Sequence, residues 1–91
     1  MTKELMNELP KIVAIDFDGT LVEDRFPAIG EPISAMFKLC KELKKVGIKL
    51  ILWTSRDNDS EAKNLDSAVK FCAEQGLTFD AVNRDRKSTR L

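Results

Sequence analysis

The sequence predicts an α/β protein of the Rossmann-like, three-layer type, with a parallel sheet and helices packed on it. Short apolar runs, such as residues 48–54, lack the polar alternation of strands that face water. Between these runs, apolar residues recur at three- and four-residue steps, as on one face of a helix. The order strand, helix, strand, helix, strand requires right-handed crossovers, which make neighbouring strands parallel. We therefore expect an incomplete sheet of about three strands with two to three helices.

The first strand is predicted over residues 11–18, and Gly19 ends it. Residues 20–31 contain Gly, Pro and mixed charges, so we expect an irregular connection. A helix should follow with Pro32 in its first turn and Gly47 just after its end. Its buried face is formed by apolar residues at helical spacing: Ile33, Met36, Phe37, Cys40 and Leu43.

The second strand is predicted over residues 48–54, followed by a polar turn. Asn58 with Glu61 three residues later resembles a helix N-cap and its capping-box partner, so the second helix should begin there and end at Gly76. Residues 79–82 are expected to form a short third strand. Residues 1–10 are polar, and we expect no more than a short helical lead-in.

Composition limits the function. Lysine plus arginine and aspartate plus glutamate both number 15, so bulk charge favours neither nucleic acid nor an anionic membrane surface. Histidine is absent, which excludes Ser–His–Asp and Cys–His catalysis and histidine-bound metals. The two cysteines and the lack of a signal-like N-terminus favour a cytoplasmic protein with reduced, buried thiols. No apolar run is long enough to span a bilayer.

The last seven residues, 85–91 (DRKSTRL), match the in-frame translation of a common sequencing adapter. The alternative is a basic, solvated tail. We expect the adapter origin, and therefore a partial domain over residues 1–84 followed by a non-native tail over 85–91. On this interpretation the natural protein continues beyond Arg84.

Two carboxylates separated by one residue end the first strand, at Asp16 and Asp18, and Gly19 and Thr20 follow. Ligands of parallel α/β sheets bind beyond the carboxyl ends of the strands, which selects residues 16–20 and 54–57. Closely spaced carboxylates favour a bound Mg²⁺. One carboxylate can attack phosphorus and form an aspartyl-phosphate, while the other moves protons. The alternative is a solvated strand end.

These residues resemble a known family. Residues 12–21 (IVAIDFDGTL) are similar to the first motif of the haloacid dehalogenase-like superfamily of phosphatases and phosphotransferases. Residues 50–54 (LILWT) are similar to its second motif, a hydrophobic strand that ends in Thr or Ser. The resemblance covers residues 11–84, and residues 79–83 are similar to those of small hydrolases of bacteria and phages without a cap domain. It implies a Mg²⁺-dependent phosphatase that acts on a small phosphorylated substrate.

The resemblance also implies roles for individual residues. Asp16 would be the nucleophile and a Mg²⁺ ligand, and Asp18 the general acid and base, with its backbone carbonyl on the metal. Thr54 would bind a phosphoryl oxygen. The adjoining Gly19, Thr20 and Ser55 would complete the phosphate site. Apart from the resemblance, Arg56 follows Thr54 by two residues, and this position predicts either that it forks onto the substrate phosphate or that it is a solvated loop arginine.

The sequence departs from the family in lacking its later lysine and acidic pair, as expected of a chain that has lost its end. This leaves open whether the chain itself is active. A catalytically incompetent fragment or a non-catalytic binding domain is the main alternative, and a receiver-type phospho-acceptor domain is more remote. The connection over residues 21–31 is too short for a cap domain, so the site should be open, with room for a second copy of the chain to complete it.

Overall fold

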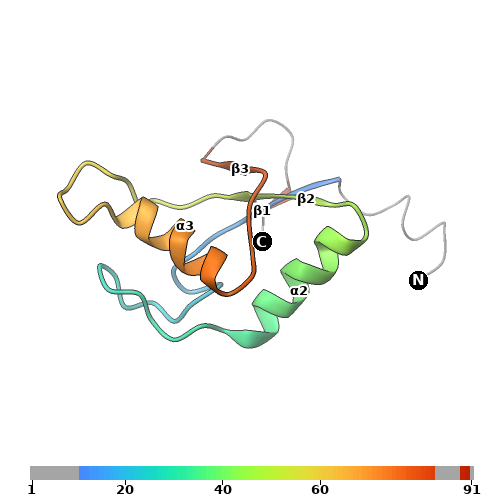
Figure 1. Ribbon diagram of the computed structural model, residues 1–91, viewed down its shortest axis with the longest axis horizontal. Coiled ribbons are helices and arrows are strands. Elements are labelled where there is room, and N and C mark those ends of the chain that lie inside the picture. Colours follow the sequence, from blue (N-terminus) through green and yellow to red (C-terminus); the bar gives the residue numbers. More distant parts are fainter. Residues whose placement is uncertain (1–10, 84–88, 91) are drawn as a thin grey trace.

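The structure is a computed structural model that describes residues 11–83 and 89–90. These residues form four strands and two helices, and Figure 1 shows their arrangement. In chain order they are β1 (Ile12–Ile15), α2 (Ser34–Lys45), β2 (Lys49–Leu52), α3 (Asn64–Glu74), β3 (Ala81–Val82) and β4 (Thr89–Arg90). The predicted fold class, a small and incomplete parallel α/β fold, is confirmed.

All the strands pair in parallel, in the order β3-β2-β1-β4. β1 and β2 are level, because Ile12 lies opposite Lys49 and Ile15 opposite Leu52. Their carboxyl ends therefore lie side by side. This register places the residues after Ile15 next to those after Leu52.

Both helices lie on the same face of the sheet, below the strands in Figure 1. The physical reason is the strand order: the chain steps from β1 to β2 to β3 in one direction, and two right-handed crossovers in one direction cover one face. The described residues therefore form two layers, and the expected third layer is not found among them. Neither described helix is long and apolar enough to cross a membrane.

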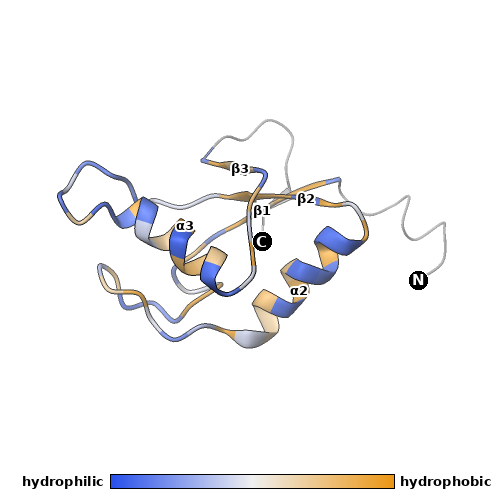
Figure 2. Ribbon diagram, viewed as in Figure 1, coloured by the Kyte–Doolittle hydropathy of each residue, from blue (hydrophilic) through white to orange (hydrophobic). Residues whose placement is uncertain are grey.

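The core lies between the sheet and the helices. Alternate residues of β1 and β2, including Ile15 and Leu52, pack there with residues of both helices. Figure 2 shows apolar residues along the strands and mixed colours along the helices, as amphipathic helices require. The ring of Phe71 meets those of Phe17 and Phe37 edge-on, with 6.4 Å between centroids in each pair, so α3 is joined to α2 and to the end of β1.

The predicted start of the second helix was wrong. Helix α3 begins at Asn64 rather than near Asn58. Asn58 nevertheless bonds the first turn of α3 from the preceding loop. Its Oδ1 accepts the main-chain N–H of Asp66 at 3.0 Å, and its Nδ2 donates to the Asp66 carboxylate at 2.9 Å. This reciprocal pair is similar to a capping box, but a loop residue supplies one partner, and its side-chain amide rather than a main-chain N–H donates to the carboxylate.

The other boundaries differ less. Helix α2 begins at Ser34, and Gly47 adopts φ +89° just after it, as the predicted helix end requires. Each predicted strand is shortened, with β3 reduced to Ala81–Val82. Asp80, just before β3, exchanges two bonds with Leu50: its N–H donates to the carbonyl, and its carboxylate accepts the N–H, both at 2.8 Å.

Residues 85–91 were expected to lie outside the fold, yet two of them form β4. Thr89 and Arg90 pair in parallel with Val13 and Ala14 of β1. An open strand edge presents main-chain donors and acceptors that any extended segment can use, whatever its side chains. The pairing therefore does not bear on where the tail comes from. The remaining tail residues, and the lead-in predicted over residues 1–10, lie outside the described residues.

Candidate functional site

The candidate site begins where β1 and β2 end side by side. Asp16 follows β1, and Trp53, which follows β2, donates its N–H to the carbonyl of Ile15 at 2.8 Å. The parallel register thus continues one residue beyond the named strands. Thr54 comes next, so the first-motif and second-motif residues meet at the carboxyl edge of the sheet, as the sequence predicted.

A tight turn reverses the chain after β1. The N–H of Leu21 donates to the carbonyl of Phe17 at 2.9 Å, and that of Gly19 to the carbonyl of Val22 at 2.8 Å. Gly19 adopts φ +83°, which residues with a side chain rarely adopt. Because the turn buries Leu21 and Val22 completely, residues 16–20 are held on a packed base.

Asp16 is the accessible carboxylate of the site. Its side chain is exposed, and one oxygen accepts the N–H of Phe17 at 2.8 Å. The described residues supply no hydrogen bond to the other oxygen. Asp16 therefore presents a free oxygen beyond the end of β1, where a ligand of this fold is expected.

In contrast, both carboxylate oxygens of Asp18 accept hydrogen bonds from Arg56. The guanidinium approaches the carboxylate side-on: Nε donates to Oδ2 and Nη2 to Oδ1, both at 2.7 Å. The Arg56 side chain is only 1% exposed and that of Asp18 16%. Charge-assisted, two-pronged pairs of this kind are among the strongest hydrogen-bonded contacts in proteins.

Arg56 is held on every side. Its Nη1 donates to the carbonyl of Pro27 at 3.2 Å, and its Nη2 to that of Ala28 at 2.8 Å. The guanidinium carbon lies 5.0 Å from the ring centroids of both Phe17 and Phe26. Arg56 is therefore not a solvated loop residue. Its contact with a substrate phosphate stays a prediction, and it would require some of these bonds to be exchanged.

Thr54 is buried, with 9% of its surface exposed, and its hydroxyl oxygen accepts the N–H of Arg56 at 3.1 Å. Its own N–H donates to the side-chain oxygen of Asn83 at 2.8 Å. Sequence reasoning missed Asn83, which holds Thr54 from beyond β3 at φ +51°. Its position directly after the third strand was the only available signal. Thr20 is half-buried and Ser55 exposed at the same edge.

The site offers a few oxygen ligands of the kind that Mg²⁺ prefers. Mg²⁺ usually keeps several waters and binds one or two carboxylates plus substrate phosphates. Asp16 has a free carboxylate oxygen, whereas both oxygens of Asp18 accept from Arg56, which leaves Asp18 its backbone carbonyl, as the resemblance implies. Within the described residues, no three or more acidic, Cys or His side chains gather to hold a metal. Protein ligands alone would therefore hold the ion weakly.

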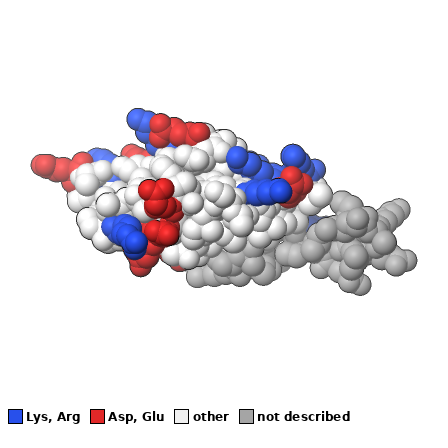
Figure 3. Space-filling view, turned by 90° about the horizontal axis from the view of Figure 1, so that it is seen from below, with Lys and Arg blue, Asp and Glu red and all other residues white. Residues whose placement is uncertain are grey.

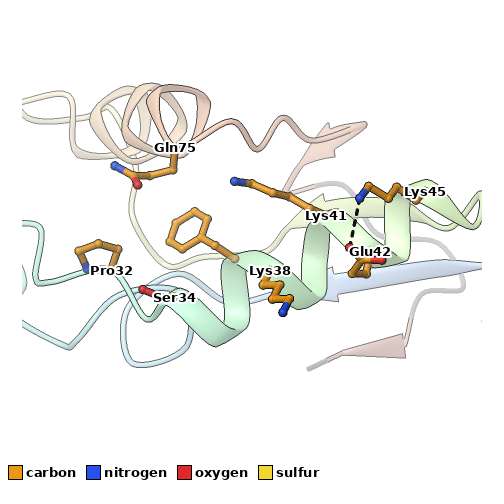
Figure 4. Close-up of a pocket in the computed structure, with 8 residues that line it drawn as sticks. Pro32, Ser34, Lys38, Lys41, Glu42, Lys45 and Gln75 are labelled. Atoms are coloured by element: carbon orange, nitrogen blue, oxygen red, sulfur yellow. Dashed lines mark hydrogen bonds and ion pairs between the residues drawn. The ribbon is translucent and has the colours of Figure 1, made fainter.

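A pocket of about 320 Å³ lies elsewhere, between α2 and the end of α3 (Figure 4). Its lining mixes polar and apolar residues and includes three lysines: Pro32, Ser34, Phe37, Lys38, Lys41, Glu42, Lys45 and Gln75. Figure 3 shows a group of basic side chains at one end of this view with an acidic side chain among them, and further basic and acidic side chains towards the other end. None of the predicted site residues lines this pocket.

The two cysteines lie in the core, away from the site. Cys40 of α2 and Cys72 of α3 are free and buried, as predicted. Burial raises the pKa of the Cys40 thiol to about 11. Burial, with a smaller contribution from Cys40, raises the pKa of Cys72 to about 12. Both thiols are therefore protonated and unreactive at neutral pH.

Comparison with known proteins identifies one solved structure with a closely similar fold. It is that of a conserved protein from Bacteroides thetaiotaomicron, which is 42% identical in sequence and superposes with a TM-score of 0.74 over 81% of this chain. The chain spans 58% of the length of that protein. No protein-family model matches the chain, and no curated protein is significantly similar to it.

Proposed function

We propose that this chain carries the phosphoryl-transfer site of a Mg²⁺-dependent phosphatase of the haloacid dehalogenase-like kind. The observation that supports it most is Asp16: an exposed carboxylate with a free oxygen, just beyond the end of a buried parallel strand. Thr54, on the neighbouring strand end, supplies a hydroxyl at the same edge. The substrate class would be a small phosphate monoester.

In the proposed reaction, the free oxygen of Asp16 attacks the phosphorus atom and forms an acyl phosphate. The bond between phosphorus and the ester oxygen breaks, and that oxygen leaves with a proton as the alcohol. Water then attacks the same phosphorus, the bond to Asp16 breaks, and inorganic phosphate leaves. The Thr54 hydroxyl can donate a hydrogen bond to a phosphoryl oxygen, because the bond from Arg56 uses only its oxygen.

Bound Mg²⁺ would offset the negative charge that the substrate phosphate brings to Asp16. The Asp16 carboxylate and the Asp18 carbonyl would hold it. The chain's own contribution is position: β1 fixes Asp16 and β2 fixes Thr54, so a phosphate between them needs no rearrangement of the sheet.

Asp18 can act as the proton carrier despite its bonds to Arg56. Each carboxylate oxygen has two lone pairs, and each accepts one bond from the guanidinium. A proton held on one of the remaining lone pairs can pass to the leaving oxygen, and the resulting carboxylate can later take a proton from the attacking water. At 16% exposure, the Asp18 side chain retains contact with the surface from which a substrate arrives.

Turnover of an aryl phosphate by the 91-residue chain tests the proposal, with and without Mg²⁺. Asp16→Asn should abolish turnover, because an amide is neither a nucleophile nor an adequate metal ligand. Asp18→Asn should lower it about 10²- to 10⁴-fold, the usual contribution of a positioned proton carrier. Asp59→Asn, an exposed acid on the loop after β2, is the matched control and should leave turnover unchanged. Activity that survives in Asp16→Asn, or after chelation of the metal, would reject the mechanism.

A non-catalytic binding domain is the second candidate, and one observation favours it. The Asp18–Arg56 pair is complete in itself, and no buried side-chain nitrogen or oxygen of the described residues lacks a partner. A purely structural ion pair would look the same. Turnover in the aryl phosphate assay would reject this candidate, because a binding domain predicts none with or without Mg²⁺.

A further inference from the structure

The connection after β1 closes into a loop whose neck is tightly built. The N–H of Glu23 donates to the carbonyl of Glu31 at 2.9 Å. Gly30 packs directly against the main-chain carbonyl of Glu23. This carbonyl occupies the space that a Cβ atom at position 30 would need. Beyond this neck, residues 23–28 are exposed, and Phe26 is 56% exposed despite its apolar ring. We call residues 24–28 the flap.

Arg56 carries the hydrogen bonds that connect the flap to the rest of the protein. Within the described residues, the flap's other hydrogen bonds run only to itself or to Glu23. The bonds from Arg56 to Pro27 and Ala28 cross to the flap, and the guanidinium also lies against the ring of Phe26. The same guanidinium holds both oxygens of Asp18. One side chain thus joins the flap to a site carboxylate.

We propose that Arg56 is a positioning residue that holds Asp18 and the flap as one unit, so that the carboxylate faces the leaving group only while the flap is docked. The inference rests on the proposed phosphatase activity, and it assigns the use of Arg56 at that site. Two features favour positioning over a direct contact with substrate. The Arg56 side chain is 1% exposed, and three of its nitrogens already donate to protein oxygens.

The planar shape of the guanidinium is essential to this arrangement. It donates to oxygens from two segments while its faces lie near Phe17 and Phe26. Lysine keeps the charge, but its single nitrogen and lack of a flat face mean that it cannot reproduce the side-on pair with Asp18 together with the bonds to both flap carbonyls. Arg56→Lys therefore separates the positioning role from the charge.

The first measurement is hydrogen–deuterium exchange over residues 23–31 in the 91-residue chain. Arg56→Lys should accelerate exchange there about tenfold or more, because the flap loses its attachment. Phe26→Ala, which changes only an exposed flap residue, should also accelerate exchange over residues 23–31. This variant tests the proposal if Arg56→Lys does not fold. Arg25→Gln, which removes an exposed arginine bound only to Asp24 and Glu23, is the matched control and should leave exchange unchanged.

The second measurement compares two substrates on the same enzyme. A misplaced proton carrier slows the ester with the poor leaving group more, because that group needs the proton. In Arg56→Lys, turnover of phenyl phosphate should fall about tenfold more than that of nitrophenyl phosphate. Partial unfolding would lower the turnover of both esters equally. A change in the ratio of the two turnover rates therefore reports the position of the Asp18 carboxyl group rather than loss of fold.

Exchange unchanged in both Arg56→Lys and Phe26→Ala would overturn the proposal, and so would an equal fall for the two substrates. If the unmodified chain hydrolyses neither ester, the proposed phosphatase and this use of Arg56 fail together at the second measurement. If the chain does hydrolyse them but the ratio does not change, only the inference about Arg56 fails.

Discussion

Asp18→Asn should destabilise the fold strongly, whatever the protein's activity. The substitution removes the charge that faces the buried guanidinium and replaces an acceptor oxygen with an NH₂ donor. Two bonds of 2.7 Å depend on those acceptors. Arg56, with a side chain 1% exposed, cannot turn to water for compensation without leaving the core.

The magnitude follows from the burial of the pair. Breaking a fully buried ion pair by removing one partner costs about 3–5 kcal/mol. Because the Asp18 side chain retains 16% exposure, we expect the lower end, about 3 kcal/mol. Small domains have a total stability of about 5–15 kcal/mol, so this is a large share of it. The corresponding fall in Tm is about 12–24 °C for a chain of this length.

Urea unfolding followed by the fluorescence of Trp53 measures this effect. Trp53 is the only tryptophan, is half-buried, and lies beside Thr54 at the site. The matched control is Glu23→Gln, which breaks an exposed ion pair with Arg25 (3.3 Å) and should change stability by less than about 1 kcal/mol. The urea dependence of the free energy of unfolding should be unchanged in both variants.

A loss in Asp18→Asn no larger than that in Glu23→Gln would refute this reasoning. It would mean that the Asp18–Arg56 contact adds little to the folded state. The activity predicted for Asp18→Asn has to be measured well below its unfolding midpoint, so that loss of fold and loss of proton transfer are not confused.

Three further predictions concern stability. The pKa values of about 11 for Cys40 and about 12 for Cys72 mean that unfolded thiols, which ionise near 9.0, release protons that folded thiols keep. Urea titrations should therefore give equal stability at pH about 7 and 8 and a fall above about 9, by at most about 1.4 kcal/mol per pH unit for each thiol. Gly30→Ala should open the neck of the flap, because the carbonyl of Glu23 occupies the space of the new Cβ; faster hydrogen exchange at Glu23 would show it. Asp80→Ala should cost about 1–3 kcal/mol in urea titrations by leaving a main-chain N–H of β2 without its acceptor, and an unchanged midpoint would contradict this.

The parts of the fold that the sequence predicted depend on local patterns. An apolar run followed by Asp16 and Gly19 was sufficient to place β1. The helical spacing of apolar residues, followed by Gly47, was sufficient to predict the buried face and the end of α2. The start of α3 was missed because the spacing of Asn58 and Glu61 imitates a capping box. Asn58 instead lies on the loop before the helix and bonds Asp66.

The environment of Arg56 could not be predicted, because its partners come from distant parts of the chain. Asp18 lies 38 positions away, and Pro27 and Ala28 lie 29 and 28 positions away. A single arginine two residues after a strand carries no sign of such partners. Asn83 was missed for a similar reason, since its bond to Thr54 spans 29 positions. The position of Asp16, in contrast, needed only the end of one strand.

The central claim is that Asp16 accepts a phosphoryl group, and borohydride trapping tests it most directly. Borohydride reduces an acyl phosphate on aspartate to homoserine, which peptide mass mapping can locate in the chain. After reaction with an aryl phosphate, homoserine should appear at position 16, only with Mg²⁺ present, and not in Asp16→Asn. Homoserine at another aspartate, or turnover of the ester with no trapped product at position 16, would contradict the claim.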